Sequence, residues 1–181
     1  MKFVTSSVMC VVMFCSVAAW SQNRQAQTKR ARDCGADCTL LKASTLPLTD
    51  QEIQDLSTIW KDEKLALDVY TALSEIYDLQ VFANIAASEQ RHLSAVATLL
   101  ARYEVPVPEP EDTTDLVSRG SVNLTEALFV GVYIEEKDIA DLQDALNNTD
   151  RRDISRVYAN LLNGSYNHLD AFESVHQVAA Q

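Results

Sequence analysis

The stretch Ser88-Glu89-Gln90-Arg91-His92 places a carboxylate and an imidazole three residues apart. Apolar residues continue this spacing of three and four on both sides, so the stretch lies on the inward face of a predicted helix. That face consists of Phe82, Ile85, Glu89, His92, Val96, Leu99 and Tyr103. Burying an ionised carboxylate is costly unless a cation, a proton or hydrogen bonds compensate it. We therefore expect a partner for Glu89 elsewhere in the chain.

Three further segments have an apolar face that polar residues interrupt near its middle. Thr49 and Glu52 form a capping box that begins the first of them, and Ser121 is the expected cap of the third helix. The segment Asn147-Asn148-Thr149-Asp150 separates the third helix from the fourth. The three faces are Leu56, Ile59, Glu63, Ala66, Tyr70, Leu73 and Tyr77; Leu124, Leu128, Gly131, Glu135, Asp138, Leu142 and Ala145; and Ile154, Tyr158, Leu161, Ser165, His168, Phe172 and Val175.

The connections between these helices predict their arrangement. Short links at 78–80 and 147–150 make each pair of consecutive helices an antiparallel hairpin. Between the hairpins, Pro106, Pro108 and Pro110 exclude a helix and favour an extended crossing that ends near Gly120. The sequence therefore predicts an all-α fold, an antiparallel four-helix bundle of two helical hairpins joined by one long crossover.

Every predicted helix brings inward polar residues to about the same depth. These residues are Glu63; Glu89 and His92; Glu135 with Asp138; and His168 with Ser165. A single inward Glu or His is commonly a hydrogen-bonded core residue. Carboxylates and imidazoles from four helices at one level are instead the ligands that a pair of iron or manganese ions takes. We therefore expect metal ions as the partners of this polar layer.

Two positions in this layer have alternatives. Glu136 competes with Glu135, because Glu136-Lys137 repeats the local sequence Glu63-Lys64. The apolar spacing favours Glu135, since Gln143 would interrupt the face that contains Glu136. Tyr70 lies two turns from Glu63 on the same face, where it is either a core residue or a donor of a hydrogen bond or an electron near the metal.

The four segments together resemble the ferritin-like superfamily of di-iron carboxylate proteins, which have two hairpins joined by a long crossover. Their pattern is Glu on the first helix, Glu-x-x-His on the second, Glu on the third and Glu-x-x-His on the fourth. The segments 60–70, 88–92, 134–142 and 167–169 are similar to an uncharacterised ferritin-like family known mainly from bacteria and archaea. The resemblance covers residues 46 to 175.

The resemblance implies that Glu63, Glu89, His92, Glu135 and His168 are metal ligands and that Glu89 bridges the two metals. The fourth helix departs from the pattern, because Ser165 stands where the second Glu-x-x-His has its carboxylate. Asp138, one turn beyond Glu135, is the candidate that would supply the missing oxygen. If it does not, the site holds one metal ion instead of two.

The N-terminal part has a different composition from the helical domain at 46–181. Residues 1–21 combine Lys2 with the apolar run from Val8 to Ala19, which is typical of a secretory signal peptide. Residues 22–45 are basic and without periodicity, which predicts a flexible tail. In an oxidising compartment its two cysteines, Cys34 and Cys38, would form a local disulfide or an intermolecular one.

These features favour a secreted, extracellular protein that binds iron, or manganese, and oxidises Fe(II) with oxygen or peroxide; whether it is an enzyme stays open. The net charge of −11 argues against nucleic acid and membrane surfaces as partners. The alternative is a non-catalytic acidic matrix protein on the same scaffold that binds calcium. The oligomeric state stays open, with a homodimer as one option. The sequons at Asn123, Asn147 and Asn163 predict a glycoprotein if the cell is eukaryotic.

Overall fold

The structure is a computed structural model that describes residues 47–179. This part of the chain contains no strand, and its helices are α2 (Asp50–Tyr77), α3 (Gln80–Arg102), α4 (Thr114–Gly120), α5 (Leu124–Asn147) and α6 (Arg152–Ala179). No helix among the described residues is both apolar and long enough to cross a membrane. The predicted signal peptide, the basic tail and the cysteine pair lie outside the described residues.

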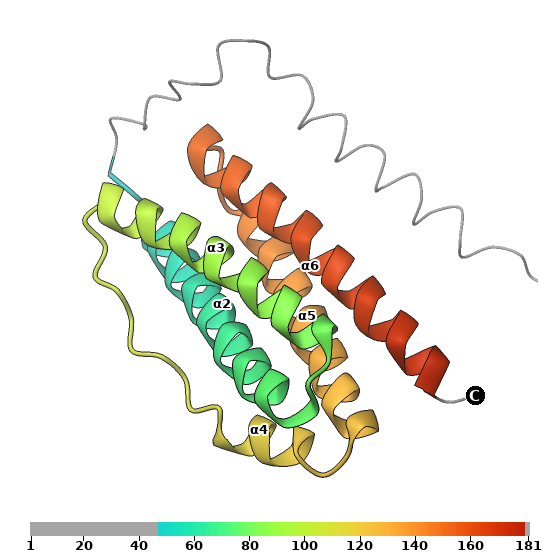
Figure 1. The fold of residues 1–181 in the computed structure, drawn as a ribbon. Helices are drawn as coiled ribbons and strands as arrows, with labels where there is room; N and C mark the ends of the chain where they lie inside the picture. The colour runs from blue at the N-terminus through green and yellow to red at the C-terminus, as the bar shows by residue number, and fades with distance from the viewer. Residues whose placement is uncertain (1–46, 180–181) are drawn as a thin grey trace, which may run out of the picture. The chain divides into compact units, whose positions relative to one another are not determined.

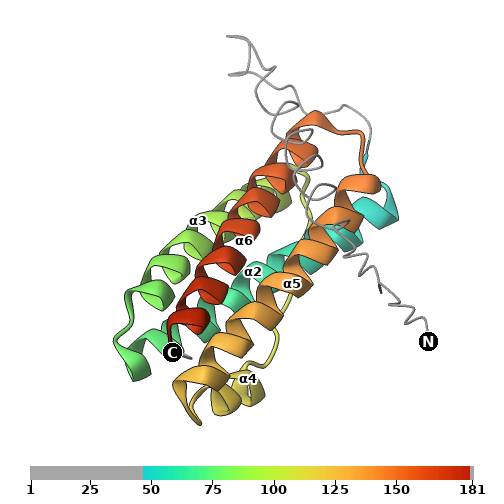
Figure 2. The same cartoon turned by 90° about the vertical axis from the view of Figure 1, so that its right-hand side faces the viewer.

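The four long helices form an antiparallel bundle (Figure 1). Helix α2 packs against α3 and α5 packs against α6, and further contacts join α2 to α5 and α3 to α6. Figure 2 shows α3 and α6 side by side with opposite directions along the bundle. The prediction of an all-α antiparallel bundle, made of two hairpins and one long crossover, is therefore confirmed.

The helix starts follow from capping side chains. Thr49 begins α2 as predicted, because its hydroxyl accepts a hydrogen bond from the Glu52 amide at 3.1 Å. The prediction that Ser121 caps the third long helix is wrong. Asn123 is the cap of α5, and its side-chain oxygen accepts from the Glu126 amide at 2.9 Å. Ser121 instead ends the short helix α4, where its hydroxyl donates to the Val117 carbonyl.

The crossover begins with a turn that redirects the chain at the end of α3. Glu104 has a left-handed backbone with φ of 58°, which lets the Val105 amide donate to the Leu100 carbonyl at 2.9 Å. Pro106 follows, and no helix forms again before Thr114 (Figure 1). The extended crossing is therefore as predicted up to this point. The seven-residue helix α4 was not predicted, and it packs against α2 and α5.

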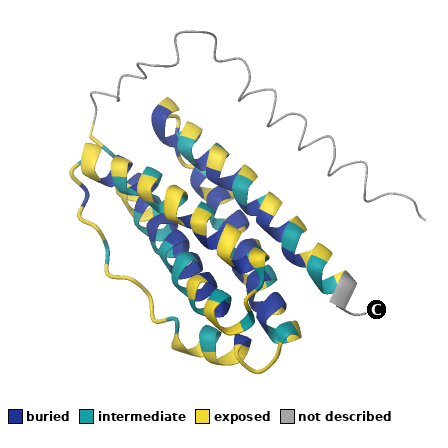
Figure 3. Ribbon diagram, in the orientation of Figure 1, coloured by how far each residue is buried: buried dark blue, intermediate teal, exposed yellow. Residues whose placement is uncertain are grey.

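Two apolar clusters fill the interior of the bundle, and the buried faces of the helices turn toward each other (Figure 3). One cluster gathers around Leu56, Leu99 and Tyr158, at the end of the bundle where α2 begins. The other gathers around Leu73, Phe82 and Phe172, near the hairpin between α2 and α3. Every helix contributes to both clusters except α4, so the residues between the clusters are held from both sides.

The predicted glycosylation sites have different surroundings. The Asn123 side chain is engaged as the cap of α5, whereas Asn147 is exposed at the last residue of that helix. Asn163 is exposed on α6, but the serine of its sequon is buried. Thr149, the threonine of the Asn147 sequon, is also buried, and glycosylation stays a prediction.

Glu52 ties the start of α2 to the connection between α5 and α6. One carboxylate oxygen accepts from the Thr49 amide at 2.9 Å. The other oxygen accepts from the Thr149 hydroxyl at 2.8 Å and from the Arg151 side chain at 2.9 Å. Glu52 is only 6% exposed, so these bonds are largely shielded from water.

We expect Glu52→Ala to lower the free energy of unfolding by about 2–4 kcal/mol, because it leaves the Thr49 amide, the Thr149 hydroxyl and the Arg151 guanidinium without this acceptor. Urea denaturation of the metal-free protein measures the effect. Glu109→Ala, at an exposed position of the crossover, is the control and should change the free energy by no more than about 0.5 kcal/mol. Equal stability of the two variants would show that the Glu52 contacts do not hold the two segments together.

Candidate metal centre

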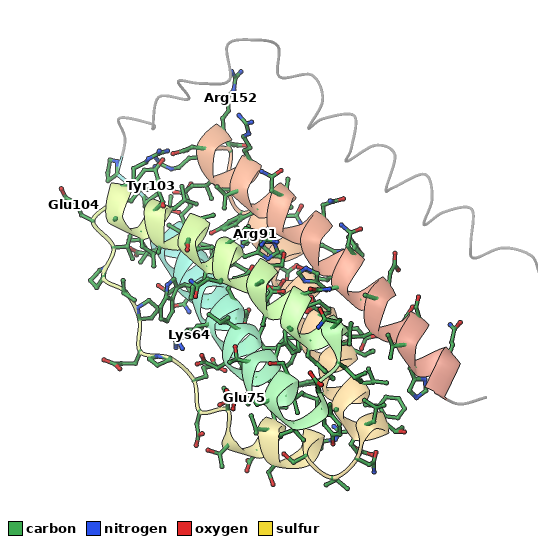
Figure 4. The ribbon with its side chains drawn as sticks, viewed as in Figure 1. Lys64, Glu75, Arg91, Tyr103, Glu104 and Arg152 are labelled. Carbon is green, nitrogen blue, oxygen red and sulfur yellow. The ribbon has the colours of Figure 1, made fainter. Side chains whose placement is uncertain are left out.

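A layer of buried polar side chains lies between the two apolar clusters. Each of the four long helices contributes to it, in accordance with the predicted depth of these residues. The layer contains Glu63, Glu89, His92, Glu135, Asp138, Ser165 and His168. Figure 4 labels Arg91, which lies on the exposed side of α3 and directly precedes His92 in the chain.

Glu63, Glu89 and His92 form the first group of side chains that could hold a metal ion. The Nδ1 atom of His92 lies 2.9 Å from Glu89 Oε2 and 3.3 Å from Glu63 Oε2. Glu63 and Glu89 are 1% and 3% exposed, so water cannot replace these contacts. One nitrogen and two carboxylates thus face a common point between α2 and α3.

Glu89, Glu135 and His168 form the second such group. The Nδ1 atom of His168 lies 2.6 Å from Glu89 Oε1 and 3.5 Å from Glu135 Oε2. The rings of His92 and His168 are stacked, with centroids 5.5 Å apart. The second group therefore lies beside the first and joins α3 to α5 and α6.

Glu89 belongs to both groups, and each of its two oxygens faces a different histidine. Burial raises the pKa of Glu89, but the neighbouring imidazoles of His168 and His92 outweigh burial and lower the pKa to about 2. Glu89 is therefore a carboxylate at neutral pH. A carboxylate whose two oxygens point to two separate ligand groups has the geometry of a bridge between two cations.

Four other titratable groups of the layer have raised pKa values in the metal-free protein. Burial raises the pKa of Glu63 well above its usual value, and the charge of Asp138 adds to this effect. Burial likewise raises the pKa values of Glu135 and Asp138. For His168, burial lowers the pKa, but Glu135 and Glu89 outweigh it and raise the pKa to about 9. The metal-free layer thus holds positive charge on His168 and excess protons on its acids.

Several atoms of the layer make no hydrogen bond within the part of the chain that the structure describes. They are Glu63 Oε1, Glu89 Oε1, Asp138 Oδ1 and His168 Nδ1. The contact between Glu89 Oε1 and His168 Nδ1 is short, yet the two atoms lack the alignment of a hydrogen bond. Carboxylate oxygens and an imidazole nitrogen that lie close together without a hydrogen-bond partner are suitable ligand atoms for a divalent metal ion. The residues present therefore fit the predicted metals.

Asp138 and Ser165 form a pair of their own beside the two groups. The Ser165 hydroxyl lies 2.6 Å from Asp138 Oδ2 and 3.0 Å from the Leu161 carbonyl. Both side chains are buried. The serine that interrupts the expected pattern on α6 thus holds an aspartate from α5.

The structure also decides the two open positions. Glu135 is 2% exposed and lies in the layer, whereas Glu136 lies on the surface. The Tyr70 hydroxyl donates to Glu135 Oε1 at 2.8 Å and lies 3.3 Å from the Gly131 carbonyl. Tyr70 is fully buried, so it is both a core residue and a hydrogen-bond donor to the candidate ligand.

Sequence reasoning missed Asp62, which is 4% exposed and forms an ion pair with Lys137 between α2 and α5. Lys137 also donates to Asp141 at 2.9 Å. The signal was present in the chain, because Ile59, Asp62, Ala66 and Val69 keep the three-four spacing. This second face was overlooked because the face with Glu63 also fits the spacing. The ion pair ties α2 to α5 beside the polar layer.

Comparison with known proteins places the chain in a family. Residues 52–180 match the family described as "Uncharacterized protein domain (DUF2202)". The chain belongs to the DUF2202 family. A relative, the uncharacterized protein MJ0754 of Methanocaldococcus jannaschii, is 42% identical over 139 residues, which cover 70% of this chain and 75% of the relative. The sequence predicted similarity to an uncharacterised family, and the DUF2202 family is also described as uncharacterised.

Solved structures resemble this DUF2202 chain in fold. The crystal structure of the hypothetical protein MJ0754 superposes with a TM-score of 0.71 and 39% identity, covering 75% of this chain and 85% of that one. A DUF305 fragment from Deinococcus radiodurans superposes with a TM-score of 0.65 and covers 73% of this chain and 99% of the fragment. Its identity of 16% makes this a similarity of fold alone.

The raised pKa of His168 predicts a pH-dependent stability of the metal-free protein. Its imidazolium stabilises the fold fully below pH 6.5, the value for the unfolded chain, and this contribution is lost as the pH rises through about 9. We expect a loss of about 2–3 kcal/mol over this range. Urea denaturation in the presence of a chelator, repeated from pH 6 to 10, measures it.

His168→Gln should make this dependence smaller, because a glutamine at this position cannot carry the proton, while the acids with raised pKa values keep part of it. His176→Gln should leave it unchanged, since His176 packs against Phe129 rather than against the acids of the layer. A wild-type stability that stays constant between pH 6.5 and 9 would contradict the proposed charge on His168.

Proposed function

We propose that this DUF2202 protein binds two iron ions, or two manganese ions, in the polar layer of the bundle. The single observation that carries the proposal is the position of Glu89, whose oxygens face His92 on one side and His168 on the other. The first metal would take Glu63 and His92 as ligands, the second Glu135 and His168, and Glu89 would bridge them. This is the ligand arrangement that the ferritin-like resemblance implies.

Asp138 is the proposed replacement for the carboxylate that Ser165 does not provide. Its Oδ1 atom is buried and makes no hydrogen bond among the described residues, while its other oxygen accepts from Ser165. The pair of metals would then have a carboxylate from α5 in place of one from α6.

Bound iron would supply the electron transfer by which Fe(II) is oxidised with oxygen or peroxide. The chain would prepare the site in three ways. The two apolar clusters exclude bulk water from the layer. Tyr70 holds one oxygen of Glu135 in place, so that the other oxygen is left for a ligand role. His168 must release its proton before its Nδ1 atom can bind a metal, so loading should release protons.

The proposal also includes the location of the protein. The pattern of residues 1–21 supports secretion, and the activity would then take place outside the cell. Normal folding of the purified protein with no bound transition metal would instead favour the alternative, an acidic extracellular matrix protein that binds calcium. Metal analysis separates the two functions.

We expect the purified protein to bind about two Fe(II) ions per chain under anaerobic conditions and to oxidise them when air is admitted. Metal content and loss of ferrous iron, followed with a chromogenic chelator, measure the two steps. The double variant Glu89→Ala and His92→Ala should lose binding, because it removes the bridge and one histidine. A wild-type protein that folds and binds neither iron nor manganese would refute the proposed function.

Glu135 and Glu136 offer a matched pair of variants for the same assay. Glu135→Ala removes a buried ligand and should weaken binding of one metal at least about tenfold. Glu136→Ala removes the same charge one residue away, at an exposed position, and should bind metal as the wild type does. Equal binding by the two variants would contradict the assignment of Glu135.

The role of Asp138 can be tested by exchanging it with its partner. Asp138→Ser should lose about one of the two metal ions, because the layer loses a carboxylate. The exchange variant, Asp138→Ser with Ser165→Asp, returns the carboxylate from α6 and should recover the lost ion. If Asp138→Ser folds and keeps full metal content, Asp138 is a structural partner of Ser165 and the five other residues are the ligands.

A further inference from the structure

Gly164 on α6 lies directly against the ring of His92 on α3. A Cβ atom placed on Gly164 would lie 2.5 Å from His92 Cε1 and 2.7 Å from His92 Nε2. Real Cβ atoms do not approach other heavy atoms this closely, so any side chain at this position requires the ring to move. Gly164 therefore provides the space that the His92 ring occupies.

The backbone conformation gives no reason for a glycine here. Among the described residues no glycine has a positive φ, and Gly164 lies inside α6. Glycine is the least favourable residue for a helix interior after proline. The close approach of the His92 ring is the feature that accounts for it. Gly131 on α5 is different, because a Cβ atom there would meet the apolar ring of Phe172.

The ring of His92 is held between the carboxylates and α6. Its Nδ1 atom lies 2.9 Å from Glu89 and 3.3 Å from Glu63. The edge formed by Cε1 and Nε2 faces Gly164, and a face of the ring stacks on His168. The imidazole is thus surrounded by carboxylates, by the backbone of α6 and by a second ring. It can make room for a side chain at 164 only by rotating, and this rotation moves Nδ1 away from the acids.

We propose that Gly164 is a positioning residue of the metal centre, whose missing side chain keeps the His92 ring where its Nδ1 atom meets Glu63 and Glu89. This inference rests on the proposed function. Only the end of the His92 side chain has to move for an alanine to fit, so the fold should survive the substitution while the ligand nitrogen is displaced. The three atoms nearest to a Cβ on Gly164 all belong to His92, so the group of Glu89, Glu135 and His168 should be retained.

The test is Gly164→Ala, with Asn163→Ala as the matched control at an exposed position of the same helix. In the metal-free protein, NMR of the ring protons reports the histidines directly, because the chain has only three. We expect Gly164→Ala to shift the His92 resonance, identified with His92→Gln, and to leave His176 unchanged. Asn163→Ala should leave both unchanged.

Titration with Co(II), followed by its visible absorption, reports the ligands in the same variants. We expect Gly164→Ala to weaken one of the two binding steps at least about tenfold and to keep the other. Asn163→Ala should keep both steps. An unshifted His92 resonance and unchanged Co(II) binding in Gly164→Ala would overturn the inference. Absence of Co(II) binding in the wild type would instead count against the proposed function, while the NMR result would still test Gly164.

A double variant covers the case in which Gly164→Ala unfolds. His92→Ala removes the ring that an alanine at 164 would meet, so adding Gly164→Ala to His92→Ala should raise the melting temperature through better helix propensity. If the alanine at 164 destabilises the protein equally with and without His92, its clash is with another group and the inference is wrong.

Discussion

The contact of the Glu89 carboxylate with two histidines is the interaction on which the interior of this bundle depends. One oxygen lies 2.9 Å from His92 and the other 2.6 Å from His168. Glu89 therefore contacts one histidine of its own helix, α3, and one histidine of α6. Glu63 from α2 and Glu135 from α5 approach the same imidazoles. All four long helices therefore meet at one buried carboxylate. A proton or cation that compensates its charge affects the contacts of all four helices.

This polar layer interrupts what would otherwise be one continuous apolar core. Four acids of the layer are each no more than 6% exposed, and the two apolar clusters lie on either side of them. Without a metal, protons on the acids and the positive charge on His168 compensate the layer. Metal ions would replace these protons and give the unpaired oxygen and nitrogen atoms a common partner. Stability and metal binding are thus two aspects of the same group of residues.

Two small residues on α6 give the centre its particular form. Ser165 holds Asp138 of α5 by a hydrogen bond of 2.6 Å. Its neighbour Gly164 leaves room for the ring of His92. A helix that supplies only one histidine to the layer therefore still shapes both halves of it. The DUF2202 relative with 42% identity has the fold in common with this chain, as its solved structure shows.

The sequence by itself determined the four long helices, the hairpins and most of the inward residues, because spacing of three and four along the chain is a local property of a helix. Glu63, Glu89, His92 and His168 were found in this way, and the spacing favoured Glu135 over Glu136. The tertiary structure alone decided that Glu89 faces both histidines, that Glu135 rather than Glu136 is buried, and that Asn123 rather than Ser121 begins α5. It alone brought Asp62 to Lys137, Ser165 to Asp138 and Gly164 to His92. These contacts join residues from different helices, and helical periodicity carries no information about how far one helix is rotated against another.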